Sequence, residues 1–145
     1  MMLFCAGESS SQKTASDKPS GGGAADRAAF EAVCGSCHPA TMVSDLRSES
    51  DWKDTVEVMV KAGAQGTQEQ LDGLLRYLRD NLTKVNVNTA TASEIAPVLA
   101  VSEATAREIV KRRTAKGSFR TIEELKQLPG VDTAKLEARK DRIVF

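Results

Sequence analysis

The sequence predicts an all-α protein with two small helical units behind a polar N-terminal tether. Apolar residues recur at helical spacing from about residue 24 onward, and capping-box motifs precede several of these stretches. Four Phe, one Tyr, one Trp and ten Gly in 145 residues leave little for a single large core. We therefore expect a tether over residues 1–24 and helical units over residues 25–84 and 85–145.

The first 24 residues are expected to form an export-signal remnant followed by a flexible linker. Met1 to Cys5 is too short for a complete signal peptide, and residues 6–25 are rich in Ser, Gly, Lys, Asp and Gln. Cys5 could carry a lipid anchor, but Phe4 is not the small residue expected before such a cysteine. An unmodified Cys5 thiol is therefore the favoured interpretation.

Charge is distributed unevenly between the two halves. Residues 1–84 hold nine Lys and Arg against twelve Asp and Glu, a net charge of −3, whereas residues 85–145 hold eleven against eight, a net charge of +3. This excess permits an anionic partner but falls short of the basic stripe typical of a dedicated nucleic-acid binder. No run of 18 apolar residues occurs, so we expect no transmembrane segment.

Three helices are expected in residues 25–84. The first runs from about Ala25 into Cys34, and the third begins at a capping box over residues 67–70. The second has Ser50 as its expected N-cap. It carries an apolar stripe at i, i+4, i+7 and i+8, formed by Trp52, Val56, Met59 and Val60.

The segment Cys34-Gly35-Ser36-Cys37-His38 has the C-x-x-C-H spacing of covalent haem attachment. Two thiols two residues apart can bind the two vinyl groups of one porphyrin, while the next residue supplies an imidazole to the iron. Cys34 and Cys37 are therefore the predicted thioether residues of one haem c, and His38 is its predicted proximal ligand. A zinc site would want four ligands, and the chain has only His38 and Cys5 to add to the two motif cysteines. A redox dithiol would need a βαβ frame, which the helical surroundings do not offer.

The second iron ligand must be a residue other than histidine, because His38 is the only histidine in the chain. Met59, on a separate predicted helix, is the favoured ligand, and Met42, four residues after His38, is the alternative. Without either, the iron would be five-coordinate and open to small ligands. Trp52 and Arg47 are candidate donors to the haem propionates, since an indole N–H and a guanidinium suit carboxylates.

Residues 30–82 resemble the small class I cytochromes c. Phe30 stands four residues before Cys34, Trp52 follows the motif, and Val56 and Met59 precede a Gly63-Ala64 loop. The resemblance implies a small helical fold around one haem, and electron transfer to and from a redox partner protein. Because such haem is attached outside the bacterial cytoplasm, it also implies a periplasmic or otherwise extracytoplasmic location.

Residues 85–145 form a different module. Capping boxes at residues 91–94 and 121–124 predict two helices, and an apolar face between them, formed by Ala106, Ile109 and Val110, predicts a third. The segment resembles the tandem helix-hairpin-helix domain of ComEA-like DNA-uptake proteins. The matching stretches are residues 87–90, 117–119 and 125–131.

In such hairpins a Gly-hydrophobic-Gly turn lets backbone amides approach a phosphate without regard to sequence. The turn within residues 98–104 reads Leu99-Ala100-Val101-Ser102, and the turn within residues 128–135 reads Gly130-Val131-Asp132. Three of the four glycines are thus replaced, one by an acid, so only weak DNA binding is expected. The basic residues that could support it are Lys111, Arg112, Arg113, Lys135, Arg139 and Lys140.

The leading hypothesis is electron transfer by a haem with His and Met ligands, with the C-terminal module as a docking domain. One alternative is a DNA-binding protein of an uptake apparatus that carries a haem, and another is a five-coordinate haem sensor or catalyst. No nucleophile with an adjacent base can be assembled once His38 binds iron, so no enzymatic activity is expected.

Overall fold

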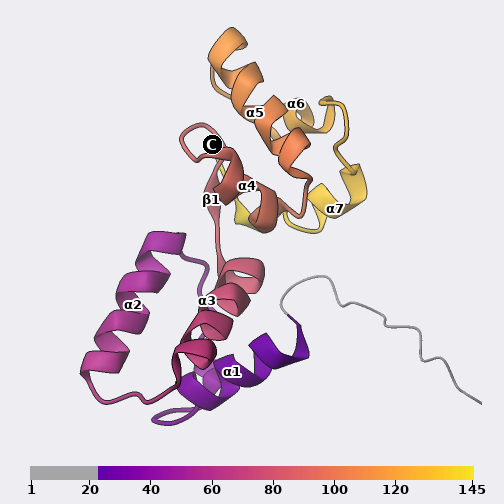
Figure 1. Ribbon diagram of the computed structural model, residues 1–145. Helices are drawn as coiled ribbons and strands as arrows, with labels where there is room; N and C mark the ends of the chain where they lie inside the picture. Colours follow the sequence, from indigo (N-terminus) through magenta and orange to yellow (C-terminus); the bar gives the residue numbers. More distant parts are fainter. Residues whose placement is uncertain (1–22) are drawn as a thin grey trace, which may run out of the picture.

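The computed structural model describes residues 23–145, which form two helical units, one above the other in Figure 1. Residues 1–22, which include Cys5 and most of the predicted tether, lie outside the described residues. The first unit contains α1 (Ala24–Cys34), the short 3-10 helix η1 (Ala40–Met42), α2 (Glu49–Lys61) and α3 (Gln68–Leu82). The second contains β1 (Val85–Asn86), α4 (Ala92–Leu99), α5 (Glu103–Lys116), α6 (Ile122–Lys126), α7 (Thr133–Glu137), η2 (Lys140–Arg142) and β2 (Ile143–Val144).

The first unit is built on a close crossing of α1 and α3. A Cβ at Gly73 of α3 would lie 3.1 Å from the Cβ of Ala29, so the absence of a side chain there brings the helices together. Phe30 stacks on Tyr77 with ring centroids 4.5 Å apart, and Arg76 pairs with Asp26 across the crossing. These contacts hold α1 against α3 from Asp26 to Phe30, and Cys34 follows one helical turn later.

Helix α2 is attached to this pair along one side only. Its N-cap is Ser48, with a full capping box to Asp51, so the prediction of Ser50 as the cap is wrong. Trp52 and Val56 are buried, but Val60 is 41% exposed. The predicted apolar stripe is therefore buried at Trp52 and Val56, partly buried at Met59 and exposed at Val60.

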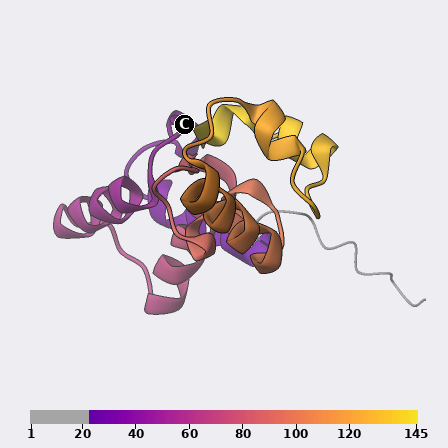
Figure 2. The same ribbon diagram turned by 90° about the horizontal axis from the view of Figure 1, so that it is seen from above.

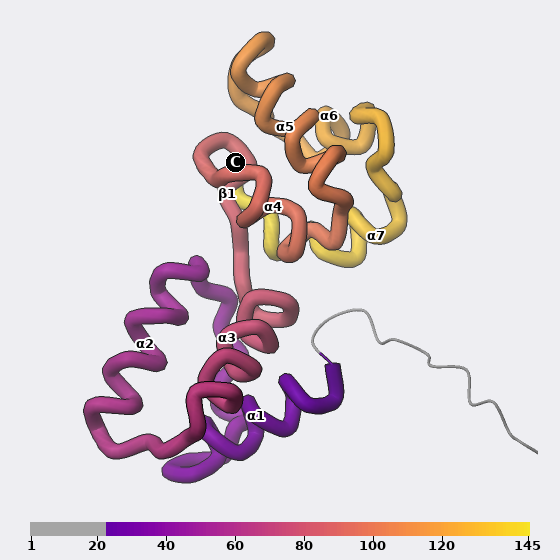
Figure 3. The backbone as a smooth tube through the Cα atoms, in the orientation of Figure 1, coloured from indigo at the N-terminus to yellow at the C-terminus, as the bar shows by residue number. Residues whose placement is uncertain are grey.

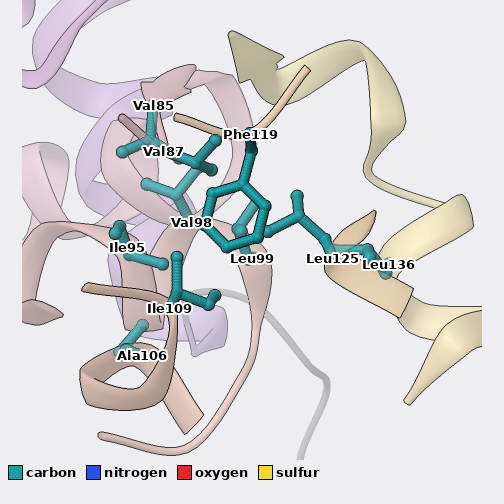
Figure 4. Packing of buried hydrophobic residues seen from close by; sticks show 11 residues of the cluster. Val85, Val87, Ile95, Val98, Leu99, Ala106, Ile109, Phe119, Leu125 and Leu136 are labelled. Atoms are coloured by element: carbon teal, nitrogen blue, oxygen red, sulfur yellow. The ribbon is translucent and has the colours of Figure 1, made fainter. Parts of the chain in front are cut away.

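The second unit has its own apolar core, shown in Figure 4. Phe119 lies among side chains from α4, α5, α6 and α7, including Leu99, Ile109, Leu125 and Leu136. The predicted N-caps Thr91 and Thr121 are confirmed, and α5 is the third predicted helix. Helix α7 and η2 were not predicted, because segments of five and three residues are too short to show a helical period.

The two units are joined by Thr83 and Lys84, which lead directly from α3 into β1 (Figure 3). The end of the chain returns to the same place, since β2 pairs in parallel with β1 through Val85 with Ile143 and Asn86 with Val144. From above, α2 extends sideways beyond the second unit (Figure 2). Within residues 23–145, every helix is too short or too polar to span a lipid bilayer.

Candidate functional site

The C-x-x-C-H motif begins at the last residue of α1. Cys34 is buried at 4% exposure, whereas Cys37 is exposed, and the Ser36 hydroxyl donates to the Val33 carbonyl at 2.8 Å. The turn formed by residues 35–38 therefore directs the two thiols to different environments. His38 follows at the edge of the same turn, partly buried.

A cavity of about 170 Å³ joins this motif to α2. Cys34, Cys37 and His38 line it from one side, and Met59 lines it from α2. The remaining walls are small or apolar, formed by Val33, Ser36, Ala62 and Ala64. The structure thus brings together both predicted thioether cysteines, the predicted proximal histidine and the favoured methionine.

A second cavity of about 90 Å³ lies on the other side of Met59. Its walls include Met42, Arg47 and Trp52, and Met59 is the residue common to both cavities. Met42 is 71% exposed and does not line the cavity that contains His38, whereas Met59 is partly buried and does. The packing therefore favours Met59 over Met42 as a partner of His38.

The imidazole of His38 is oriented in a way that suits a metal ligand. Its Nδ1 lies 3.3 Å from the carbonyl oxygen of Pro39, and a carbonyl can only accept a hydrogen bond. With the proton on Nδ1, Nε2 has a lone pair that could bind a metal ion. Such a contact both fixes the tautomer and restrains the ring.

Exposed apolar side chains lie on and near α2. Met42, Val58 and Val60 are the large hydrophobic residues of the first unit that remain exposed. Two separate small cavities meet at Met59 next to this surface, and together they are smaller than the pockets that enclose cofactors of porphyrin size. A flat apolar group would have to separate α2 from the motif, and α2 is the helix attached along one side only.

The predicted propionate donor Trp52 has a hydrogen-bond partner within the protein. Its indole Nε1–H donates to the carbonyl oxygen of Leu82 at 2.8 Å, so its single donor is already used. The guanidinium of Arg47 lies 5.2 Å from the Trp52 ring centroid, and it donates to Thr55 at 3.2 Å. Arg47 is exposed, pairs with Asp45 at 3.8 Å and lines the second cavity, so its role as a propionate donor stays a prediction.

The two alternative chemistries of the cysteine pair fit less well. A redox dithiol needs a low thiol pKa, but burial raises the pKa of the Cys34 thiol, and the C-terminal end of α1 disfavours a thiolate. Among the described residues, no group of three or more His, Cys, Asp or Glu side chains could hold a metal ion. A zinc site is therefore not supported within residues 23–145.

The turns of the second unit show what replaced the expected glycines. Ala100 ends α4 in the left-handed conformation with φ of 53°, and the Ser102 hydroxyl accepts from the Thr105 amide at the start of α5. In the other turn Gly130 has φ of 79°, and a Cβ there would lie 2.8 Å from the Thr105 hydroxyl. Ala100 and Gly130 therefore both have left-handed backbone, although three of the four expected glycines are absent.

Comparison with known proteins supports this architecture. Residues 80–144 match the family described as helix-hairpin-helix motif. The match supports a helix-hairpin-helix domain in this part of the chain, which is called by that name below. The ComEA-like kind predicted from the sequence agrees with this match, although the match begins inside α3 and leaves residues 24–79 uncovered.

Relatives resemble this chain over a limited length. An uncharacterized protein of Haemophilus influenzae is 43% identical over 63 residues, covering 43% of this chain and 56% of that protein. The human endonuclease/exonuclease/phosphatase family domain-containing protein 1 is 40% identical over 63 residues, and the protein of that name in Danio rerio is 38% identical over 60. These cover 43% and 41% of this chain but 11% of each relative. No solved structure matches this chain.

In the helix-hairpin-helix domain, the amides that could meet a phosphate in the second turn are already occupied. One carboxylate oxygen of Asp132 accepts from the amides of Ala134 at 3.0 Å and Lys135 at 3.1 Å. The side chain of Asp132 therefore takes the place of an anionic ligand at this turn.

The six basic residues predicted to attract DNA all have partners within the domain. Arg112, Arg113 and Arg139 donate to backbone carbonyls, those of Gly117, Val87 and Val98. Lys111, Lys135 and Lys140 pair with Glu108, Asp132 and Glu137. The arginines are structural donors, and the pairs neutralise part of the positive charge of the lysines.

Proposed function

We propose that residues 24–84 hold one covalent haem c and that the protein transfers single electrons. The observation that carries the proposal is the cavity lined jointly by Cys34, Cys37, His38 and Met59. The two cysteines would hold the group through thioether bonds, and His38 and Met59 would be its iron ligands. When bound, haem supplies a reversible one-electron couple.

The residues around the cavity suit electron transfer better than catalysis. Met59 would favour the reduced iron and close the site to small ligands, and the buried Cys34 and Val33 would limit access of water. We therefore propose no enzymatic activity. An extracytoplasmic location and a redox partner protein are part of the same proposal, because covalent haem is attached outside the bacterial cytoplasm.

An absorption spectrum tests the haem proposal. The chain would be produced with an export signal and a cytochrome c maturation system, as wild type, Met59→Ala and the control Met42→Ala. We expect a band of the oxidised protein near ~695 nm in the wild type and in Met42→Ala, and its loss in Met59→Ala. Purified protein without covalently bound haem would contradict the proposal. Haem without this band, together with carbon monoxide binding, would favour the five-coordinate sensor or catalyst.

A second candidate function is nucleic-acid interaction by the helix-hairpin-helix domain, and the family match favours it. The family match over residues 80–144 bears on this function. Electron transfer has no such match and depends on the C-x-x-C-H motif and the cavity next to it. In this candidate the protein belongs to a DNA-uptake type of apparatus and also carries a haem. The occupied amides at Asp132 and the paired basic residues argue instead for docking to a protein.

Binding of labelled duplex DNA separates these two roles. Fluorescence anisotropy would be measured at low and physiological salt for the wild type, Asp132→Gly and the exposed control Asp141→Gly. We expect weak wild-type binding that disappears as salt rises, and tighter binding by Asp132→Gly because two amides become available. Tight, salt-resistant wild-type binding would favour the DNA-uptake role, and no binding by any variant would favour docking to a protein.

A further inference from the structure

The C-terminal end of α3 is capped by groups from both units. The last carbonyls of an α-helix have no partner within the helix, so other groups must bind them. The Leu82 carbonyl accepts from the Trp52 indole at 2.8 Å and from the Arg47 amide at 3.2 Å. The Arg47 carbonyl in turn accepts from the Lys84 amide at 2.9 Å. The segment before α2 is therefore bonded to the residues that follow α3.

The second cap of α3 comes from the far end of the chain. Arg142 lies in the helix-hairpin-helix domain, is only 8% exposed, and donates through Nη1 to the Asp80 carbonyl at 2.7 Å and the Val98 carbonyl at 3.3 Å. A cation at a helix C-terminus is favoured by the helix dipole. Burial lowers the pKa of the Arg142 guanidinium to about 10, and its Nη2 has no hydrogen-bond partner among the described residues. The contact between α3 and α4 therefore depends on the two bonds that Nη1 donates.

We propose that residues 80–84 are a joint through which the helix-hairpin-helix domain positions α2 and thereby Met59, with Arg142 and Trp52 as its positioning residues. The part that concerns Met59 rests on the proposed haem function. Trp52 begins the stripe that leads along α2 to Met59, and Arg142 binds α3 two residues before the carbonyl that holds Trp52. The pairing of β1 with β2 holds the segment that follows the joint.

The chain offers a matched control for Arg142. Arg139 also donates to the Val98 carbonyl, at 2.8 Å, but it makes this bond within the helix-hairpin-helix domain and does not reach α3. Arg142→Met and Arg139→Met therefore both remove a guanidinium from the Val98 carbonyl. They differ in whether a contact to α3 is lost.

Imidazole competition in the haem-loaded full chain tests the proposal. We expect the imidazole concentration that displaces Met59 to fall about fivefold in Arg142→Met and in Trp52→Phe, which corresponds to the loss of one hydrogen bond. Arg139→Met should leave it unchanged, and Arg142→Lys should recover part of the wild-type value. An equal shift in Arg142→Met and Arg139→Met would overturn the proposal.

A second readout does not depend on haem. Trp52 is the only tryptophan, so its emission reports on the joint in the full chain produced without haem. We expect Arg142→Met to shift this emission to longer wavelength and to increase quenching by acrylamide, with no change in Arg139→Met. If haem is absent but this difference appears, the haem function fails and the joint stands. If the two variants give identical emission, the joint fails whatever the haem result.

Discussion

Single residues in the two hairpin turns decide what the helix-hairpin-helix domain can bind. Ser102 and Asp132 each accept hydrogen bonds from amides at the start of the following helix. These caps stabilise α5 and α7, but they occupy donors that would otherwise face an anion. Ser102 and Asp132 thus stabilise the helix ends and leave fewer amides available to bind an anion.

Ala100 provides a prediction at this scale. A non-glycine residue in the left-handed region costs about 1 kcal/mol, and Ala100 has φ of 53°. We expect Ala100→Gly to raise the free energy of unfolding by about 0.5–1 kcal/mol in urea denaturation. The control Ala96→Gly, inside α4, should lower it by about 1 kcal/mol. A loss of stability in both variants would show that the turn is not strained.

At the scale of elements, the crossing of α1 and α3 depends on the missing side chain at Gly73. A valine there would meet Ala29 and Asp26, which lie 3.1 Å and 3.2 Å from the position of a Cβ. We expect Gly73→Val to lower the free energy of unfolding by about 1–3 kcal/mol, measured by circular dichroism in urea. Asp72→Val, at the exposed neighbouring position, should change it by less than about 0.5 kcal/mol.

The helix caps predict how stability depends on pH. The pKa of the Glu94 carboxyl lies below its ordinary value of 4.5, chiefly because the Thr91 amide donates to it. A lowered pKa in the folded state contributes stability above pH 4.5, and this is lost as pH falls through the folded value. We expect Glu94→Gln to weaken the loss of stability between about pH 6 and about pH 3.5. An unchanged slope would mean that this carboxylate is not linked to folding.

At the scale of the whole molecule, the two units differ in how completely side chains fill their cores. The helix-hairpin-helix domain has a continuous buried cluster that includes Phe119, Leu125 and Leu136. The first unit has a smaller cluster and leaves Met42, Val58 and Val60 exposed. A unit of about sixty residues whose own side chains fill its core incompletely generally needs further support, such as a cofactor, a metal ion or a partner.

Hydrogen exchange would measure this difference. In the full chain without haem, we expect amides of α2 to exchange faster than those of α4 and α5, because fewer buried contacts hold α2. In the haem-loaded chain the protection of α2 should rise, since a ligand that binds only the folded state stabilises it. Equal protection of α2 with and without haem would contradict a structural role for the cofactor.

The sequence by itself determined the longer helices and singled out the residues of the predicted haem site. Capping boxes located the starts of α3 and α4, and the invariant geometry required of two thioethers and an imidazole singled out Cys34, Cys37 and His38. Local patterns suffice there because the caps and the motif act over a few neighbouring residues. The N-cap at Ser48 also has a local signal, its capping box with Asp51, whereas the exposure of Val60 depends on how α2 packs.

Only the tertiary structure decided which donors and acceptors are already used. Trp52 is bonded to Leu82 thirty residues away, and Arg142 to Asp80 sixty-two residues away. Met59 lines the same cavity as His38 although the two residues belong to separate segments of the chain. Contacts over such separations follow from how the helices pack, and no local spacing in the sequence encodes them.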